Sequence, residues 1–183
     1  TNNIVTPYPL GYAFKPVMSQ PAGFYYQPSL DIALSSFQND GTLRYTTDGS
    51  TPSATSPAYT SPITIIKTTV IRARFFPNSA QQLPSFVETN TYFLNESHTV
   101  PVISVASEDY DELFATHGEI MTSFEFFETD HSRVFTMEGD MRGHGNDSGA
   151  DRVHHRPAVV CARCGNDGSQ RVMGSPRPDW VQD

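Results

Sequence analysis

The residues most suggestive of chemistry lie in a glycine-rich run that begins at Met141, MRGHGNDS. Closely spaced glycines let backbone N–H groups approach phosphate oxygens, and a neighbouring arginine supplies positive charge. A phosphoryl-transfer site also needs a further cation on the phosphates and acidic or amide ligands for Mg²⁺. The chain has no lysine after Lys67. We therefore expect no catalytic residues, no ATP or Mg²⁺ cofactor, and only the outline of a nucleotide-binding loop, formed by Arg142, Gly143, Gly145, Asn146 and Ser148.

A second candidate group consists of metal-ligand residue types near the C-terminal end. Cys161 and Cys164 have the C-x₂-C spacing of a zinc site, and His154 and His155 precede them. A single C-x₂-C pair is weak evidence, and adjacent histidines rarely both reach one metal. The alternative is an irregular tail over residues 149–183, where five of the 12 basic residues lie, all of them arginine. An out-of-frame reading of GC-rich DNA would resemble this Pro/Gly-rich text, so a frameshifted tail is the favoured interpretation.

Aromatic side chains suggest a third kind of site, because the faces of aromatic rings suit the apolar faces of sugars. Tyr25, Tyr26 and Tyr59 are the candidates. Packing in or near the core is the favoured alternative, since most aromatic residues have that role. Glycoside hydrolysis would need two carboxylates roughly 5–10 Å apart across a cleft. Asp31 and Asp48 are instead expected on an exposed strand face and in a turn, so we reject a hydrolase site here.

The composition excludes several function classes. The 183-residue chain has a net charge of −8, and residues 1–148 hold 16 acidic but only seven basic residues. Binding to a phosphate backbone depends on Lys and Arg, so nucleic acid is not an expected partner. No apolar run approaches the roughly 20 residues of a membrane-spanning helix. Both cysteines lie in the tail, so the rest of the chain is not a disulfide scaffold.

Residues 20–94 carry the strongest secondary-structure signals. In SLDIALSS, Leu30, Ile32 and Leu34 alternate with polar or small residues, as in a half-buried strand. TLRYTT, PITIIK, TTVIRARFF and VETNTYFL predict further strands, at roughly ten-residue spacing with turns between them. This pattern predicts a mainly β chain that contains a small antiparallel β-sandwich. The expected core includes Ile63, Ile65, Val70 and Ala73.

Turn and linker signals bound these strands. In DGSTP, Asp48 can bond its own downstream backbone and Gly49 tolerates positive φ, so the pair is expected to build a hairpin turn. The Pro-rich residues 1–19 show little periodicity and are expected to form a linker or the end of a preceding domain.

The strand segments resemble the chitobiase/β-hexosaminidase C-terminal type of β-sandwich, also called the fibronectin type III-associated or family-29 glycoside-hydrolase-like domain. The resemblance covers about residues 20–94 and implies an immunoglobulin-like accessory module of secreted bacterial proteins. Such modules often lie beside carbohydrate-active or surface-anchored domains, and the resemblance does not imply catalysis. The residues that carry it are Tyr45, Thr46, Asp48, Gly49, Ser50, Pro52, Ser56, Tyr59, Pro62, Ile63, Ile71, Arg72 and Ala73.

Residues 95–148 follow a different pattern, which predicts a partial α+β segment. A buried strand is expected first, and Ser107 is a good N-cap for a short helix that Gly118 can terminate. SFEFFE and RVFTME predict two strands, joined by a hairpin turn over residues 129–132, with Phe124 and Phe126 on one face. The expected buried strand residues are Val100, Val102, Ile103 and Val105, and the expected helix face holds Tyr110, Leu113 and Phe114.

This order of elements, ending in the loop from Arg142 to Ser148, resembles the opening of the spore-coat protein H (CotH) kinase-like family. The resemblance covers about residues 99–148, only the first part of a domain several times longer. In that family a lysine-bearing strand follows the loop, and the metal-binding and catalytic acids lie much further on. The resemblance therefore implies an N-terminal fragment of a kinase-like domain rather than a working enzyme.

Together these observations predict a non-catalytic β-sandwich accessory or interaction module of a larger exported bacterial protein. Its expected partners are polysaccharide or other domains of the same parent protein, and its expected location is extracellular or on the cell surface. Two alternatives stay open: a fragment of an atypical CotH-type kinase with a phosphate loop, and a zinc-binding tail.

Overall fold

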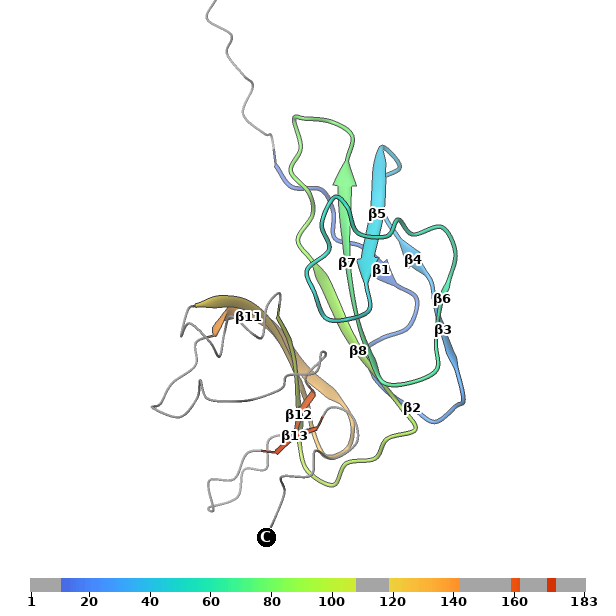
Figure 1. Cartoon of the computed structure of the whole chain (residues 1–183), viewed down its shortest axis with the longest axis vertical. Helices are drawn as coiled ribbons and strands as arrows, with labels where there is room; N and C mark the ends of the chain where they lie inside the picture. Colours follow the sequence, from blue (N-terminus) through green and yellow to red (C-terminus); the bar gives the residue numbers. More distant parts are fainter. Residues whose placement is uncertain (1–10, 108–118, 142–158, 162–170, 174–183) are drawn as a thin grey trace, which may run out of the picture.

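In the computed structural model, the described parts of the chain are residues 11–107, 119–141, 159–161 and 171–173. Every regular element within them is a β-strand, which confirms the mainly β fold class. The strands form a sandwich followed by a second sheet (Figure 1). The predicted helix that follows Ser107 lies outside the described residues. None of the described residues belongs to a helix long and apolar enough to cross a membrane.

One layer of the sandwich is a four-stranded sheet with the order β2-β8-β7-β5. β7 pairs antiparallel with both β5 and β8, as expected, but β2 pairs parallel with β8. The expectation of a purely antiparallel sandwich is therefore wrong at this edge. β2 leaves the sheet by a loop to the opposite layer, so it has no tight hairpin to β8 that would impose antiparallel pairing. The strand bounds are β2 Gly23–Tyr25, β5 Gly41–Thr46, β7 Thr69–Pro77 and β8 Glu88–Leu94.

The opposite layer consists of two short antiparallel pairs, β1–β4 and β3–β6. The predicted single strand in SLDIALSS is interrupted at Ala33, so that its two halves pair with different partners. Both halves keep the alternation of buried and exposed residues that a half-buried strand requires. The bounds are β1 Val17–Met18, β3 Leu30–Ile32, β4 Leu34–Ser35 and β6 Ile63–Ile65.

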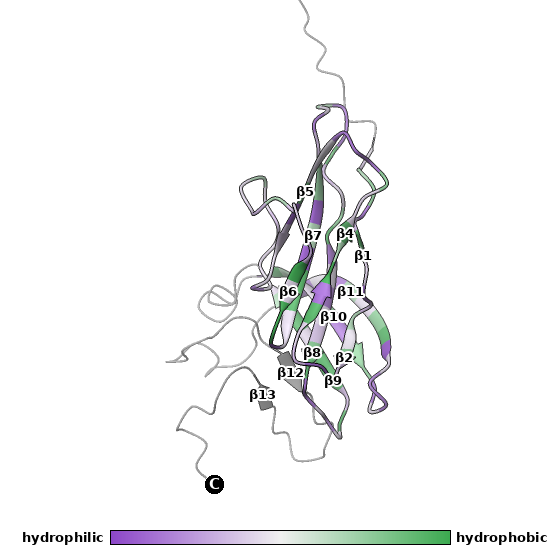
Figure 2. Cartoon of the chain, turned by 90° about the vertical axis from the view of Figure 1, so that its right-hand side faces the viewer, coloured by the Kyte–Doolittle hydropathy of each residue, from purple (hydrophilic) through white to green (hydrophobic). Residues whose placement is uncertain are grey.

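The core lies between these two layers, and hydrophobic and hydrophilic residues are mixed along the strands of both (Figure 2). Side chains from the short pairs meet Ile71, Ala73, Tyr92 and Leu94 of the larger sheet. The predicted core residues Ile63, Ile65, Val70 and Ala73 are all buried. Val70 has the opposite parity to Ile71 and Ala73 along β7, so it is buried on the other face of that sheet.

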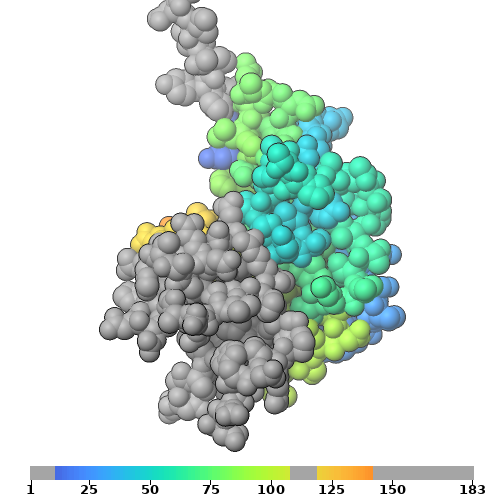
Figure 3. All heavy atoms as spheres, in the orientation of Figure 1, coloured from blue at the N-terminus to red at the C-terminus, as the bar shows by residue number. Residues whose placement is uncertain are grey.

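The sandwich begins earlier than the sequence predicts. Tyr12 forms a parallel bridge with Leu83, and the Ala13 amide donates to the Leu83 carbonyl. β1 also lies within the segment expected to be a linker. Residues 11–19 are therefore part of the folded module, and Figure 3 shows the start of the described chain (blue) against the segment near residue 85 (green). The short bridge leaves no periodic pattern in the sequence, which is why the prediction failed here.

The Asp48–Gly49 turn has the predicted local chemistry. Asp48 Oδ1 accepts hydrogen bonds from the Ser50 amide and hydroxyl at 3.0 and 2.5 Å, and Gly49 has a φ of 79°. The turn belongs to a wide connection rather than a tight hairpin, because the chain returns beside β5 only at Ala58, which bridges Arg44. The local conformation was predictable, whereas the length of the connection was not.

Replacing Gly49 with alanine is expected to lower the free energy of unfolding by about 1–2 kcal/mol, since a Cβ atom is unfavourable at this φ. Asparagine tolerates the left-handed region better than alanine does, so Gly49→Asn should cost less. Urea denaturation of the three proteins measures both differences. A larger loss for asparagine than for alanine would mean that side-chain volume, not backbone conformation, governs this position.

The second sheet has the strand order β11-β10-β9-β12-β13. β9 confirms the predicted strand from Val102 onward, with Val102 and Val105 buried and Ile103 half-buried, whereas Val100 is half-buried and precedes the strand. Phe124 and Phe126 share one face of β10 as predicted, but both are half-buried, and the alternate residues Ser123, Glu125 and Phe127 are more deeply buried. The bounds are β9 Val102–Ser107, β10 Ile120–Phe127, β11 Arg133–Met141, β12 Val159–Cys161 and β13 Arg171–Met173.

Two features of this sheet bear on the sequence predictions. The hairpin turn between β10 and β11 is confirmed: Asp130 Oδ1 accepts hydrogen bonds from the Ser132 amide and hydroxyl, and these bonds lower the pKa of Asp130. Within the tail predicted to be irregular, residues 159–161 and 171–173 instead form β12 and β13, which extend the sheet beyond β9, and the rest of residues 149–183 lies outside the described chain. Neither strand shows alternation in the sequence, and the pairing of β12 with β9 and of β13 with β12 depends on strand neighbours that local pattern does not reveal.

Candidate functional site

The outer face of the sandwich's larger sheet packs against one face of the second sheet, and the junction is largely polar. Along β8, Thr89 and Thr91 point toward this junction, where they bond Ser123, Ser104 and Glu125 of the second sheet. All five side chains are buried. Buried polar groups are tolerated only when hydrogen-bonded, so these contacts fix how the two sheets meet.

Arg72 is the largest fully buried side chain at this junction and is 2% exposed. Its Nη1 donates to the Gly49 carbonyl at 3.1 Å and to Thr51 Oγ1 at 2.9 Å. Nε donates to Thr89 Oγ1 at 3.3 Å, and Nη2 donates to Ser123 Oγ at 3.2 Å. One guanidinium group therefore joins β7, β8, the Asp48–Gly49 turn and β10.

Glu125 occupies the neighbouring position and is 1% exposed. Its Oε2 accepts a hydrogen bond from the Thr91 hydroxyl at 2.5 Å, and its Oε1 accepts one from Arg133 Nη1 at 2.9 Å. Arg133 Nη1 also donates to Asn90 Oδ1 at 2.8 Å. Burial raises the pKa of Glu125, and the hydrogen bonds from Thr91 and Arg133 oppose that rise. Both carboxylate oxygens are engaged by protein groups, so the arrangement is that of a structural ion pair rather than a general acid or base.

The far end of the junction is apolar. Phe93 of β8 and Phe127 of β10 pack edge to face with ring centroids 5.1 Å apart, beside Ala22 and Val102. Phe24 stacks on Phe93 at 4.3 Å. This small cluster excludes water from one side of the polar contacts, which strengthens them.

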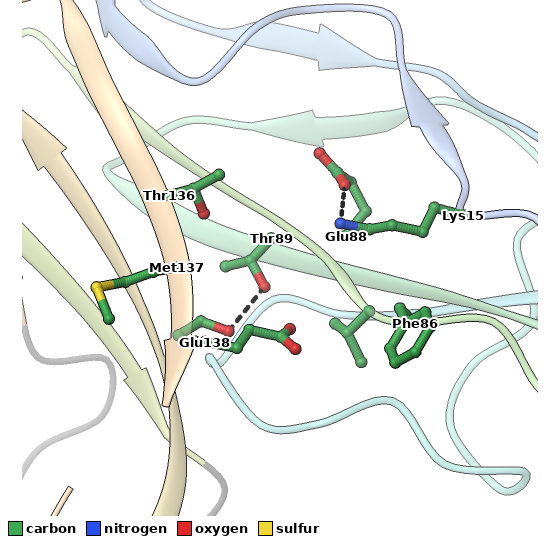
Figure 4. Close-up of a pocket in the computed structure, with 9 residues that line it drawn as sticks. Lys15, Phe86, Glu88, Thr89, Thr136, Met137 and Glu138 are labelled. Atoms are coloured by element: carbon green, nitrogen blue, oxygen red, sulfur yellow. Dashed lines mark hydrogen bonds and ion pairs between the residues drawn. The ribbon is translucent and has the colours of Figure 1, made fainter. Parts of the chain in front are cut away.

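At the opposite end the junction opens into a groove of about 260 Å³ (Figure 4). One wall carries Phe86, Glu88 and Lys15, and Lys15 Nζ lies 2.8 Å from Glu88 Oε2. The other wall is the β11 segment of Thr136, Met137 and Glu138, and Thr89 and Ser123 also line the groove. Phe86 is 53% exposed, and its ring contacts that of Tyr12, which is 52% exposed, with centroids 4.6 Å apart.

The three tyrosines proposed as a sugar platform pack against different partners. Tyr25 packs on Tyr92 with ring centroids 6.0 Å apart, and its hydroxyl group donates a hydrogen bond to the Pro21 carbonyl. Burial raises the pKa of Tyr25. Tyr59 packs edge to face on Tyr45 at 6.5 Å and borders the core. Tyr26 is exposed, and its hydroxyl is 3.1 Å from His131 Nδ1. A role in sugar binding stays a prediction for all three, with packing roles evident for Tyr25 and Tyr59.

Asp31 and Asp48 lie where the sequence places them. Asp31 is on the exposed face of β3 and accepts a hydrogen bond from Thr64 of the paired strand β6. Asp48 caps its own turn. Neither carboxylate lines the groove between the sheets, so neither is positioned for hydrolysis there.

The other predicted site residues fall outside the described chain. The loop residues Arg142, Gly143, Gly145, Asn146 and Ser148 follow directly after β11, and no conformation is described for them. The proposed zinc ligands His154, His155 and Cys164 are likewise outside, and for Cys161 only the backbone in β12 is described. Within the described residues no group of three or more His, Cys, Asp or Glu side chains could hold a metal ion. The phosphate loop and the zinc site both stay predictions.

The sequence contained one overlooked signal for the junction. TVIRARFF places Arg72 and Arg74, and SFEFFE places Glu125, inside runs of strand-forming apolar residues. Such a charge is buried when both faces of its strand are covered, and it then needs a partner. Tyr12 and Phe86 gave no comparable signal, because their contact depends on a bridge between distant segments.

Comparison with known proteins finds a family model that matches part of the chain. The sequence model of the chitobiase/β-hexosaminidase C-terminal domain matches residues 20–87, which include β2 to β7 of the sandwich. This domain is a non-catalytic accessory β-sandwich. The match does not extend to residues 95–148, so their resemblance to the CotH kinase-like family stays a prediction. Neither a curated protein nor a solved structure matches the chain.

Proposed function

We propose that the chain is an accessory segment of a larger exported protein, in which the β-sandwich holds the following sheet in a fixed position. The observation that carries this proposal is the hydrogen-bonded junction, where Arg72, Thr89 and Thr91 of the sandwich bond Ser104, Ser123 and Glu125 of the second sheet. A flexible spacer would have no need to bury charged groups, whose desolvation is costly unless their partners are held in place.

The proposal predicts energetic coupling across the junction. The Thr91 hydroxyl donates to Glu125 and is 2.6 Å from the Ser104 hydroxyl. In a double-mutant cycle on the full chain, Thr91→Val and Ser104→Ala should show a coupling of about 0.5–1.5 kcal/mol in the free energy of unfolding. Both changes remove a hydroxyl group with little loss of volume.

Thr64→Val is the matched control, because Thr64 is an exposed threonine on β6 and bonds Asp31 rather than the second sheet. Its effect should add to that of Ser104→Ala without coupling. Additive effects of Thr91→Val and Ser104→Ala would contradict a fixed junction.

A second candidate function is association with polysaccharide outside the cell. Its support is the match to an accessory domain named after enzymes that act on amino-sugar glycans, together with exposed aromatic residues beside a polar groove. The module would then hold its parent protein near a glycan without acting on it. Oligosaccharide binding by the full chain tests this candidate, in the experiment described below.

A further inference from the structure

We propose that the groove between the two sheets, with the Tyr12–Phe86 ring pair at its edge, binds a neutral oligosaccharide. This inference rests on the polysaccharide association proposed above and assigns it to a site built by both sheets. The site residues are Tyr12, Lys15, Phe86, Glu88, Thr136 and Glu138.

The first argument concerns the exposed rings. Tyr12 and Phe86 are each about half exposed, yet they lie only 4.6 Å apart at an interplanar angle of 31°. At this distance and angle the two rings form a tilted stack, and the outer face of the stack is an apolar platform about the size of one ring, which is unfavourable to leave in water. The C–H face of a pyranose ring is a flat apolar surface of similar size, so a sugar can cover this platform while its hydroxyl groups stay solvated.

The second argument concerns the groups next to that platform. Phe86 lines the groove together with Glu88, which is paired with Lys15 at 2.8 Å. Thr136 and Glu138 are exposed on the opposite wall (Figure 4). The groove therefore offers carboxylate acceptors, an ammonium donor and a hydroxyl group that can act as either. Sugar hydroxyl groups are both donors and acceptors, and a mixed set of this kind matches them.

The third argument concerns charge and size. Two carboxylates and one ammonium group line the groove, and the ammonium group is already paired with Glu88. Phosphorylated or uronic-acid sugars would meet net negative charge, so a neutral sugar is favoured. A volume of about 260 Å³ is slightly below the roughly 300–1,000 Å³ of typical small-molecule pockets. One sugar unit would occupy the groove, and the next would lie on the exposed rings.

Isothermal titration calorimetry of the full chain with two probes tests this inference. The probes are the β-1,4-linked hexamer of glucose and the β-1,4-linked hexamer of N-acetylglucosamine. We expect at least one hexamer to bind, Phe86→Ala to weaken it about tenfold and Glu138→Gln to weaken it about fivefold. Glu138 is exposed, so Glu138→Gln should unfold thermally like the unmodified chain, whereas Phe86→Ala loses the ring contact with Tyr12 and should unfold at a slightly lower temperature.

Two exposed aromatic residues away from the groove provide controls. Phe37→Ala removes an 82% exposed ring that contacts Phe14, and Tyr26→Ala removes the exposed member of the predicted tyrosine platform. Neither change should alter the affinity. Unchanged binding in Phe86→Ala and Glu138→Gln would overturn this site but leave polysaccharide association standing. Failure of the unmodified chain to bind either hexamer would overturn both, without bearing on the coupling between Thr91 and Ser104.

Discussion

Replacement of Arg72 with alanine is expected to lower the free energy of unfolding of the full chain by about 3 kcal/mol, which corresponds to a fall of roughly 6–12 °C in melting temperature. The guanidinium group is 2% exposed and donates to Gly49, Thr51, Thr89 and Ser123. Its removal leaves several buried acceptors without a donor and opens a cavity where the second sheet meets the sandwich. Thermal and urea unfolding, followed by circular dichroism, measure the change.

Arg44→Ala is a matched control on the neighbouring strand β5. The Arg44 side chain is half-buried and donates to the Ser56 carbonyl at 2.6 Å, so its loss should cost about 1 kcal/mol. Arg72→Lys retains the charge but not the planar guanidinium group that donates to several acceptors at once. An intermediate loss in the free energy of unfolding is therefore expected. Equal effects of Arg72→Ala and Arg44→Ala would show that Arg72 does not hold the junction together.

The sandwich was largely predictable because its signals are local. The alternation around Leu30 and Ile32, and the buried pair Ile63 and Ile65, specify which faces point inward. The Asp48–Gly49 turn depends on an Asx bond two residues along the chain and on one positive φ. Interactions between residues so close in the sequence can be predicted from the residue types and their spacing.

The junction and the groove were not predictable because they depend on contacts between distant residues. Arg72 meets Ser123 across 51 positions, and Thr91 meets Glu125 across 34. The parallel pairing of β2 with β8 and the bridge between Tyr12 and Leu83 likewise join segments that share no pattern. A strand reveals which residues lie on one face, but not which other strand covers that face. The proposed sugar site therefore differs from the tyrosines chosen from the sequence.

Glu125 is expected to make the stability of the chain depend on pH in a direction opposite to that of an ordinary ion-paired carboxylate. Burial raises its pKa in the folded state above the ordinary value of 4.5. The folded state then holds the proton more tightly than the unfolded state does. The stability from this group is fully present below pH 4.5 and is lost as the pH rises through the higher pKa of the folded state.

Two substitutions separate the charge of Glu125 from its hydrogen bonds. Glu125→Gln keeps an oxygen for Arg133 and supplies an amide that can donate to Thr91, but it cannot titrate. The free energy of unfolding of Glu125→Gln, relative to the unmodified chain, should therefore rise as the pH increases above 4.5. Glu125→Ala removes both acceptors and leaves a cavity, and should cost about 3 kcal/mol at neutral pH.

Glu128→Gln is the control for this pH dependence, because Glu128 is an exposed glutamate at the end of the same hairpin. Urea unfolding of the three proteins between pH 4.5 and 8 gives the relative stabilities directly. If Glu125→Gln loses stability relative to the unmodified chain as the pH rises, the attraction between Glu125 and Arg133 outweighs the cost of burying the carboxylate. The ion pair, which joins β10 to β11 within the second sheet, would then contribute more to stability than the Thr91 hydrogen bond that crosses to the sandwich.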